Sequence, residues 1–219
     1  MSDPKEALVN AALGHVVFEG WSEVTFKAAI ADSGVDPALA RALCPRGSVD
    51  LAVAFHKQGD AEMLARITAE DMSAMRYSEK VARCVQLRFE VIPDKEAVRR
   101  GATLFALPQY AAEGSQLIWG TADAIWNALG DSSDDVNWYT KRLTLSGVYS
   151  STLLYWLGDD SLDGQATWAF LERRIDGVMR IEKAKAKANE NPILKAALAG
   201  PNWLGSMIKP PKSADLPGG

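Results

Sequence analysis

The stretch that decides the fold runs from Asp123 to Trp156 and reads DAIWNALGDSSDDVNWYTKRLTLSGVYSSTLLYW. Apolar side chains recur at helical spacing on both sides of a polar segment, Gly130 to Asp135. Glycine ends helices, and serine and aspartate begin them, so the stretch predicts two helices joined by a short hinge. Asn137, Trp138 and Tyr139 stand at the start of the second helix, where propensity alone would not place two large aromatic residues. Two explanations remain open. The pair forms an exposed surface that contacts a partner, or it belongs to the cap of the helix and packs against it.

The rest of the chain repeats this pattern of helices separated by breakers, and no run alternates like a β-strand. The expected helix starts, each with a capping residue, are Asp3-Pro4, Ser22, Asp36-Pro37, Ser48 and Asp94. The sequence therefore predicts an all-α fold. We expect a three-helix unit over residues 1–47, a larger helical domain over 48–190, an amphipathic helix over 191–209 and a disordered tail over 210–219.

The N-terminal unit has the layout of a helix-turn-helix, with a turn at Gly34-Val35 and the pattern Thr25-Phe26-x-x-Ala29-x-Ala31-x-x-Gly34-Val35. Followed by a wholly helical chain, this layout resembles the TetR regulators, in which a small N-terminal domain precedes a helical ligand-binding domain. The expected recognition helix, 36–43, offers one cation and no Asn, Gln, Ser or Thr to contact base edges. Residues 1–50 carry four Lys/Arg against seven Asp/Glu, the wrong sign for phosphate contacts. We therefore expect a vestigial unit that binds no nucleic acid.

The formal charge of -4 is unevenly distributed along the chain. From residue 180 onwards there are seven Lys/Arg and three Asp/Glu, whereas the preceding part has 17 Lys/Arg and 25 Asp/Glu. A basic end on an acidic body predicts contact with an anionic surface. Cys44 and Cys84 are too few for a disulfide framework or a zinc site, which favours a reducing compartment. No apolar run reaches the roughly 18 residues needed to span a bilayer, so we expect a soluble or peripheral protein.

No motif in the chain predicts catalysis. His15 and His56 have no partner at metal-ligand spacing, and phosphate loops, a nucleophile elbow and a His-Glu-x-x-His motif are missing. The acidic run 131–135 lacks the internal glycine and distal glutamate of a calcium loop, and helix capping explains it better. The sequence therefore predicts a protein that is not an enzyme and holds no metal or cofactor.

Three expected helices are rich in large apolar side chains and also contain the glycines Gly101, Gly114, Gly120 and Gly147. Each glycine within a helix costs about 1 kcal/mol relative to alanine, which close helix packing or room for a ligand would explain. We expect a lipid-binding pocket, and an ordinary helical core is the alternative. The candidate lining residues are Leu104, Phe105, Leu117, Ile118, Trp119, Ile125, Trp126, Val148, Tyr149, Leu153 and Trp156.

The expected C-terminal helix is strongly amphipathic. Its polar residues Lys195, Asn202, Ser206 and Lys209 fall within about 60° of one another on a helical wheel. A narrow polar stripe opposite a wide apolar face is typical of a helix lying in a membrane interface. A closing helix packed on the domain is the alternative, and Gly200-Pro201 favours a kink. The candidate membrane-binding residues are Lys195, Leu194, Leu198, Trp203, Leu204, Met207 and Ile208.

Several motifs with fixed spacing lie between residues 75 and 180. They are Ile125-Trp126, Gly130-Asp131, Asp135-x-Asn137-Trp138-Tyr139-Thr140-x-Arg142, Val148-Tyr149 and Thr167-Trp168-x-Phe170-Leu171-x-x-Arg174. On these motifs the chain resembles the accessory lipid-binding proteins of coenzyme Q (ubiquinone) biosynthesis. The resemblance implies a TetR-like fold without DNA binding, a bound isoprenoid lipid or quinone in place of a cofactor, and a C-terminal amphipathic helix on an anionic membrane surface.

The resemblance also implies a partner, the di-iron demethoxyubiquinone hydroxylase, to which the protein would present its lipid. Asp135, Trp138, Tyr139 and Arg142 match the family's surface for this partner. The eukaryotic members carry a presequence that the start of this chain does not resemble, so we expect a peripheral protein on the cytoplasmic, inner face of a bacterial membrane. A homodimer is left open. A TetR-type transcriptional regulator with a lipid effector is the alternative function.

Overall fold

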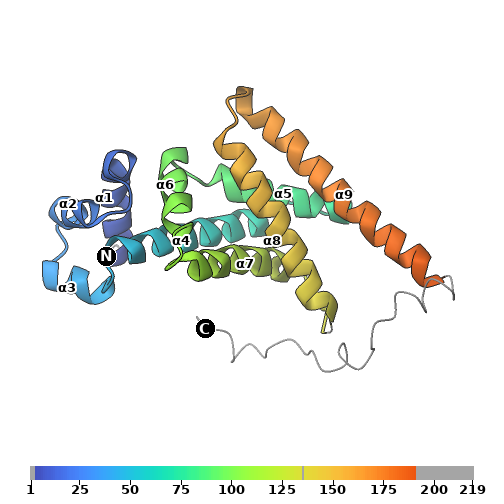
Figure 1. Ribbon diagram of the computed structural model, residues 1–219, viewed down its shortest axis with the longest axis horizontal. Coiled ribbons are helices and arrows are strands. Elements are labelled where there is room, and N and C mark those ends of the chain that lie inside the picture. Colours follow the sequence, from blue (N-terminus) through green and yellow to red (C-terminus); the bar gives the residue numbers. More distant parts are fainter. Residues whose placement is uncertain (1–2, 135, 191–219) are drawn as a thin grey trace. The chain divides into compact units, whose positions relative to one another are not determined.

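The computed structural model describes residues 3–134 and 136–190, and within them the regular elements are helices (Figure 1). The expected all-α fold is confirmed. The elements are α1 (Pro4–Glu19), α2 (Glu23–Ser33), α3 (Pro37–Leu43), α4 (Ser48–Ala69), α5 (Tyr77–Glu90), α6 (Lys95–Phe105), α7 (Ala111–Ala128), α8 (Val136–Leu157), the 3-10 turn η1 (Leu162–Gly164) and α9 (Gln165–Glu190).

Most of the expected helix starts are confirmed by their caps. The side chains of Asp3, Ser22, Asp36 and Asp94 accept hydrogen bonds from backbone amides two or three residues later. Each of these bonds satisfies an amide that the first turn of a helix leaves without an intrahelical acceptor. The capping chemistry of these four residues therefore places the helix boundaries.

Ser48 is not the cap that the sequence predicts. It lies inside the first turn of α4, and the cap position belongs to Gly47 at a positive φ of 63°. The positive φ selects glycine there, because L side chains rarely adopt this backbone conformation. The helix ends at Ala69.

The chain divides into two compact units. The N-terminal unit comprises Met1–Asp71 and Cys84–Thr121, and the C-terminal unit comprises Met72–Arg83 and Ala122–Gly219. In the N-terminal unit, α1, α2 and α3 share one apolar core with α4 and α6, and the Trp21 indole donates a hydrogen bond to the Ala97 carbonyl at 3.1 Å. Buried residues on both sides of residue 47 therefore belong to one apolar core.

A buried polar cluster ties α4, α5 and α7 together in the N-terminal unit. Arg88 is 4% exposed, and its Nε donates to Asp60 at 2.6 Å while Nη2 donates to the His56 carbonyl at 3.0 Å. The Thr121 hydroxyl donates to the same Asp60 oxygen at 2.9 Å, and His56 Nε2 lies 2.9 Å from the Thr121 oxygen. Buried polar groups are tolerated when they are paired in this way.

Gly59→Ala is expected to destabilise the protein by about 1–3 kcal/mol, because a Cβ there would lie 2.6–2.8 Å from the Arg88 guanidinium, which is held in place. The control is Gly120→Ala, where no described atom lies within 4 Å and helix propensity predicts a gain of up to about 1 kcal/mol. Urea unfolding measures the change in the free energy of unfolding of both variants, which should be opposite in sign. Equal effects would show that Arg88 moves aside freely.

The stability of the N-terminal unit is expected to depend on pH through His56. Burial is the main cause that lowers the pKa of His56 from 6.5 to about 4. The unfolded state then binds more protons than the folded state between these values, so stability falls by about 3 kcal/mol as the pH drops from 6.5 to 4. Urea unfolding of His56→Gln should show a flatter pH profile over this window. An unchanged profile would contradict the assignment.

Candidate functional site

A buried arginine closes the hinge between α7 and α8 in the C-terminal unit. Arg142 is 1% exposed, and its Nε donates to Asp123, its Nη2 donates to Asn127 at 3.0 Å and its Nη1 donates to Asp131 at 3.0 Å. Nη1 also donates to the backbone carbonyl of Trp138 at 3.2 Å. The guanidinium therefore fixes the first turns of α8 against the last turns of α7, with every side chain of the contact paired.

Asp131, in the hinge, holds a second cation as well. Its Oδ1 accepts hydrogen bonds from the Lys141 ammonium at 2.6 Å and the Ser133 hydroxyl at 2.9 Å. Burial raises the pKa of Asp131, but the hydrogen bonds from Lys141, Ser133 and Arg142 outweigh it and lower that pKa to about 2. The carboxylate is therefore ionised at neutral pH and binds two consecutive residues of α8 at once.

Trp138 and Tyr139 lie half-exposed at the start of α8. Their rings meet edge to face with centroids 4.7 Å apart, and the Arg142 guanidinium lies 4.0 Å from the centre of the Trp138 ring. Val136 and Leu143 are exposed on the same helix, Leu143 by 67%. This end of α8 thus presents an apolar and aromatic surface, and the Arg142 guanidinium lies against one of its rings, that of Trp138.

Arg142 was expected on the partner surface, but it is buried. A side chain that is 1% exposed cannot contact a partner, and the structure assigns it to holding Trp138 from within. In its buried position Arg142 forms ion pairs with the carboxylates of Asp123 and Asp131. Asp135, the fourth residue expected on this surface, lies outside the described residues.

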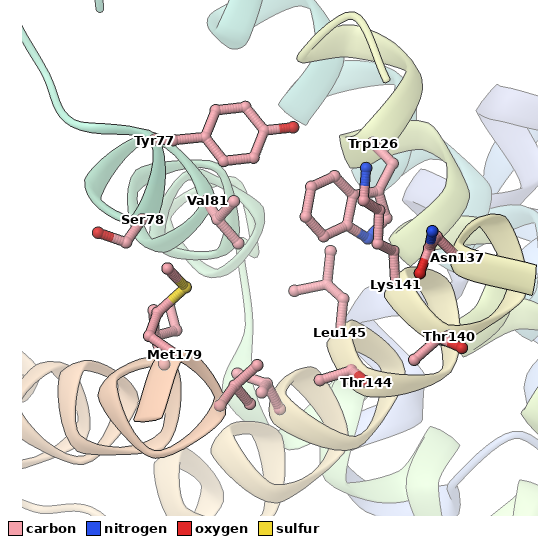
Figure 2. Close-up of a pocket in the computed structure, with 13 residues that line it drawn as sticks. Tyr77, Ser78, Val81, Trp126, Asn137, Thr140, Lys141, Thr144, Leu145 and Met179 are labelled. Atoms are coloured by element: carbon pink, nitrogen blue, oxygen red, sulfur yellow. The ribbon is translucent and has the colours of Figure 1, made fainter. Parts of the chain in front are cut away.

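A cavity of about 290 Å³ lies in the C-terminal unit, bordered by α5, α7, α8 and α9 (Figure 2). Figure 2 shows Tyr77 and Val81 of α5 on one side and Trp126 and Leu145 on the other. The apolar side chains of its wall include Val81, Leu145, Val148, Ile175, Val178 and Met179. The polar side chains of α8 in the wall are Asn137, Thr140, Lys141 and Thr144.

Two of the expected pocket residues, Trp126 and Val148, line this cavity. The others do not: Ile125, Tyr149, Leu153 and Trp156 lie elsewhere in the C-terminal unit, and Leu104, Phe105, Leu117, Ile118 and Trp119 belong to the N-terminal unit. Apolar size alone does not show which face of a helix a residue occupies. The cavity positions of α8 follow the spacing i, i+3, i+4, i+7, i+8, i+11 from Asn137 to Val148, and this spacing is the signal that finds the missed polar residues.

The expected membrane-binding residues lie outside the described part of the chain. They are Lys195, Leu194, Leu198, Trp203, Leu204, Met207 and Ile208. Among the described residues, no helix has both the length and the apolar character to cross a bilayer. The same residues contain no group of three or more His, Cys, Asp or Glu placed to hold a metal ion.

The helix-turn-helix offers little to a nucleic acid. Arg41, the one cation of α3, donates to Glu23 at 2.6 Å, and its guanidinium lies 4.5 Å from the centre of the Phe26 ring. Leu39 is exposed on the same short helix. The positive charge of Arg41 is thus already paired within the N-terminal unit.

The part of the chain that carries this site is similar to known proteins. The COQ9 family model matches residues 111–182, from the start of α7 into α9. The ubiquinone biosynthesis protein COQ9 of Rattus norvegicus is 30% identical over 183 residues, which are 80% of this chain and 58% of that protein. The probable ubiquinone biosynthesis protein coq9 of Dictyostelium discoideum is 28% identical over 193 residues, or 85% of this chain and 63% of that protein. The chain is similar to the COQ9 proteins of ubiquinone biosynthesis over most of its length.

The resemblance to the coenzyme Q biosynthesis family is thereby confirmed. The chain spans about three fifths of the length of these relatives, both of which are named as mitochondrial proteins. The TetR transcriptional regulator from Nitrosomonas europaea ATCC 19718 matches it with a TM-score of 0.63 and 19% identity, over 80% of this chain and 97% of that one. The expected TetR-like fold is confirmed by this match.

Arg142→Met is expected to destabilise the C-terminal unit by about 3–5 kcal/mol, because it leaves Asp123 and Asp131 without their shared cation. Arg173→Met is the control, since Arg173 is exposed on α9 and its replacement should change stability by less than about 0.5 kcal/mol. Urea unfolding followed by tryptophan fluorescence measures both. A loss below 1 kcal/mol for Arg142→Met would contradict the anchoring role.

Proposed function

We propose that this protein acts in ubiquinone biosynthesis as a lipid-binding accessory protein without catalysis of its own. It binds isoprenoid quinone intermediates at the membrane and presents them to the demethoxyubiquinone hydroxylase. The observation that supports the proposal best is that one helix, α8, carries both a cavity wall and a partly exposed aromatic pair beside the exposed Val136 and Leu143. The relatives named as ubiquinone biosynthesis proteins supply the pathway.

The cavity has the character of a lipid site. Val81, Val148, Ile175 and Met179 give it an apolar wall, and each CH₂ group buried there gains about 0.8 kcal/mol. A volume of about 290 Å³ is at the low end for small-molecule sites. It therefore suits the ring and the first part of an isoprenoid chain rather than a long polyprenyl tail.

The aromatic surface at the start of α8 is the proposed docking site for the hydroxylase. Tryptophan and tyrosine are the side chains that most often dominate the energy of protein interfaces. Arg142 holds the Trp138 ring before any partner arrives, so little side-chain entropy is lost on docking. Asp135 remains part of the proposed surface.

The segment 191–209 is the proposed membrane anchor. Its apolar face and its lysines Lys195 and Lys209 suit insertion at the surface of a membrane that contains anionic lipid. The inner face of a bacterial membrane is the proposed location, and a homodimer is compatible with the proposal.

The combined variant Trp138→Ala and Tyr139→Ala is expected to weaken binding of the hydroxylase at least about thirtyfold, the effect of losing a hot spot worth about 2 kcal/mol. Tyr155→Ala is the matched control, because Tyr155 is an exposed aromatic residue of α8 that stacks on Phe170 instead. Calorimetric titration of the purified hydroxylase with each variant measures the difference. Unchanged affinity in the double variant would rule out this docking surface.

Removal of residues 191–219 is expected to abolish flotation of the protein with liposomes that contain anionic lipid. The segment holds the apolar face and several of the basic residues that such binding requires. Flotation at low and high salt separates the apolar from the electrostatic contribution, since salt screens only the latter. A truncated protein that still floats would show that the anchor lies elsewhere.

A TetR-type regulator with a lipid effector is the second candidate, and the likeness to a TetR regulator favours it at the level of the fold alone. The Arg41–Glu23 pair and the acidic N-terminal residues speak against it. Salt-dependent, sequence-selective DNA binding would support the regulator, and its loss with Arg41→Ala would locate the contact in α3.

A further inference from the structure

Lys141 belongs to the wall of the cavity and also holds the hinge between α7 and α8. Its side chain lines the cavity, and its ammonium lies 5.5 Å from the centre of the ring of Trp126, another residue of the wall (Figure 2). The same ammonium donates hydrogen bonds to Asp131 at 2.6 Å and to Ser133 at 2.7 Å. A ligand in the cavity therefore contacts a side chain that is bound to the hinge.

The two partners of this ion pair differ in their access to water. The Asp131 side chain is 1% exposed, whereas the Lys141 side chain is 36% exposed. Because Lys141 lines the cavity, a ligand that fills the cavity removes water from around it. The loss of water lowers the local dielectric constant, and the attraction between the ammonium and the carboxylate then becomes stronger. Filling the cavity thus tightens the ion pair of Lys141 and Asp131.

Asp131 supports the aromatic surface of α8 with its other oxygen. Oδ1 binds Lys141, and Oδ2 accepts a hydrogen bond from Arg142 Nη1 at 3.0 Å. Nη1 also donates to the Trp138 carbonyl, and the guanidinium lies 4.0 Å from the centre of the Trp138 ring. Because a carboxylate is rigid and planar, fixing one oxygen restricts the other. Order at Lys141 therefore reaches Trp138 through three successive contacts.

Order at Trp138 favours the docking of a partner. Side chains lose rotational freedom when an interface forms, and a ring that is already held loses less of it. Two sites can be coupled in this way without a change of shape, because the first ligand has already ordered groups that the second must order. A partner that docks on Trp138 therefore binds the protein with a filled cavity more tightly than the protein with an empty one.

We propose that Lys141, Asp131 and Arg142 form a relay that makes the affinity for the hydroxylase depend on whether the cavity is filled. The relay lets the hydroxylase distinguish the protein with lipid from the protein without it, and the protein dissociates more readily once its lipid has been transferred. Lys141 and Asp131 are positioning residues here, since they act on the docking surface through Arg142. The proposal rests on the proposed function and adds to it the regulation of the same site.

The test is calorimetric titration of the purified hydroxylase with the full chain, first freed of co-purified lipid and then saturated with a short-chain ubiquinone. The filled protein should bind the hydroxylase at least about fivefold more tightly, and by linkage the hydroxylase should raise the affinity for the quinone by the same factor. Equal affinities of the filled and the empty protein would overturn the relay and leave both binding events of the proposed function intact. If the chain binds no quinone or no hydroxylase, the proposed function itself fails, and the relay with it.

Lys141→Met tests the route, because it removes the ammonium and keeps most of the length of the side chain. It should abolish the difference in hydroxylase affinity between filled and empty protein, whereas a merely structural role would lower both affinities and leave their ratio unchanged. Lys80→Met is the matched control, since Lys80 lies on α5 in the same unit but does not line the cavity. This control should keep the full difference. Quinone that binds to the hydroxylase directly would act equally on both variants.

A ratio in Lys141→Met equal to that of the wild type would contradict the relay. Loss of quinone binding in this variant would contradict it as well, because Lys141 would then be a contact of the ligand rather than a positioning residue. Circular dichroism checks the fold of each variant. If Lys141→Met does not fold, the wild-type affinities and Lys141→Gln decide the proposal, since glutamine keeps a hydrogen-bond donor without the charge and should reduce the difference to less than about twofold.

Discussion

The buried guanidinium of Arg142 is the interaction on which the C-terminal unit depends. Asp123, Asn127 and Asp131 are spaced four residues apart, so the last turns of α7 and the hinge place all three side chains around one cation. A buried ion pair of this kind adds little net stability compared with apolar packing, but breaking it is costly. Its effect is positional: it fixes where α8 begins and which of its faces meets the cavity.

The two proposed activities share this anchor. Asp131 binds Lys141, which lines the cavity, and Arg142, which lies against the Trp138 ring on the outer surface. Consecutive residues of one helix point in directions about 100° apart, so a single carboxylate supports two different faces of α8. The proposed function requires the cavity face and the aromatic face of α8 to keep a fixed orientation relative to each other. The shared carboxylate of Asp131 supports that orientation.

The fold was largely predictable from the sequence, whereas the site was predictable only in part. Helix starts follow from capping chemistry within a few residues, and the prediction for Ser48 failed because the neighbouring Gly47, at a positive φ, takes the cap position. Val148 was expected in the pocket and lines it, but Leu117 was expected there and belongs to the other unit. Composition shows that a helix is apolar, and only tertiary packing shows what its face meets. The burial of Arg142 could have been inferred from the acidic and amide residues spaced along α7.

The central claim is that the cavity of the C-terminal unit holds an isoprenoid lipid. Mass spectrometry of the lipids that co-purify with the native protein tests it most directly. The account predicts an isoprenoid quinone, or a phenolic precursor of one, in stoichiometric amount. A protein that carries no lipid, or only a random set of phospholipids, would contradict it and leave the aromatic surface of α8 as the remaining basis for a function.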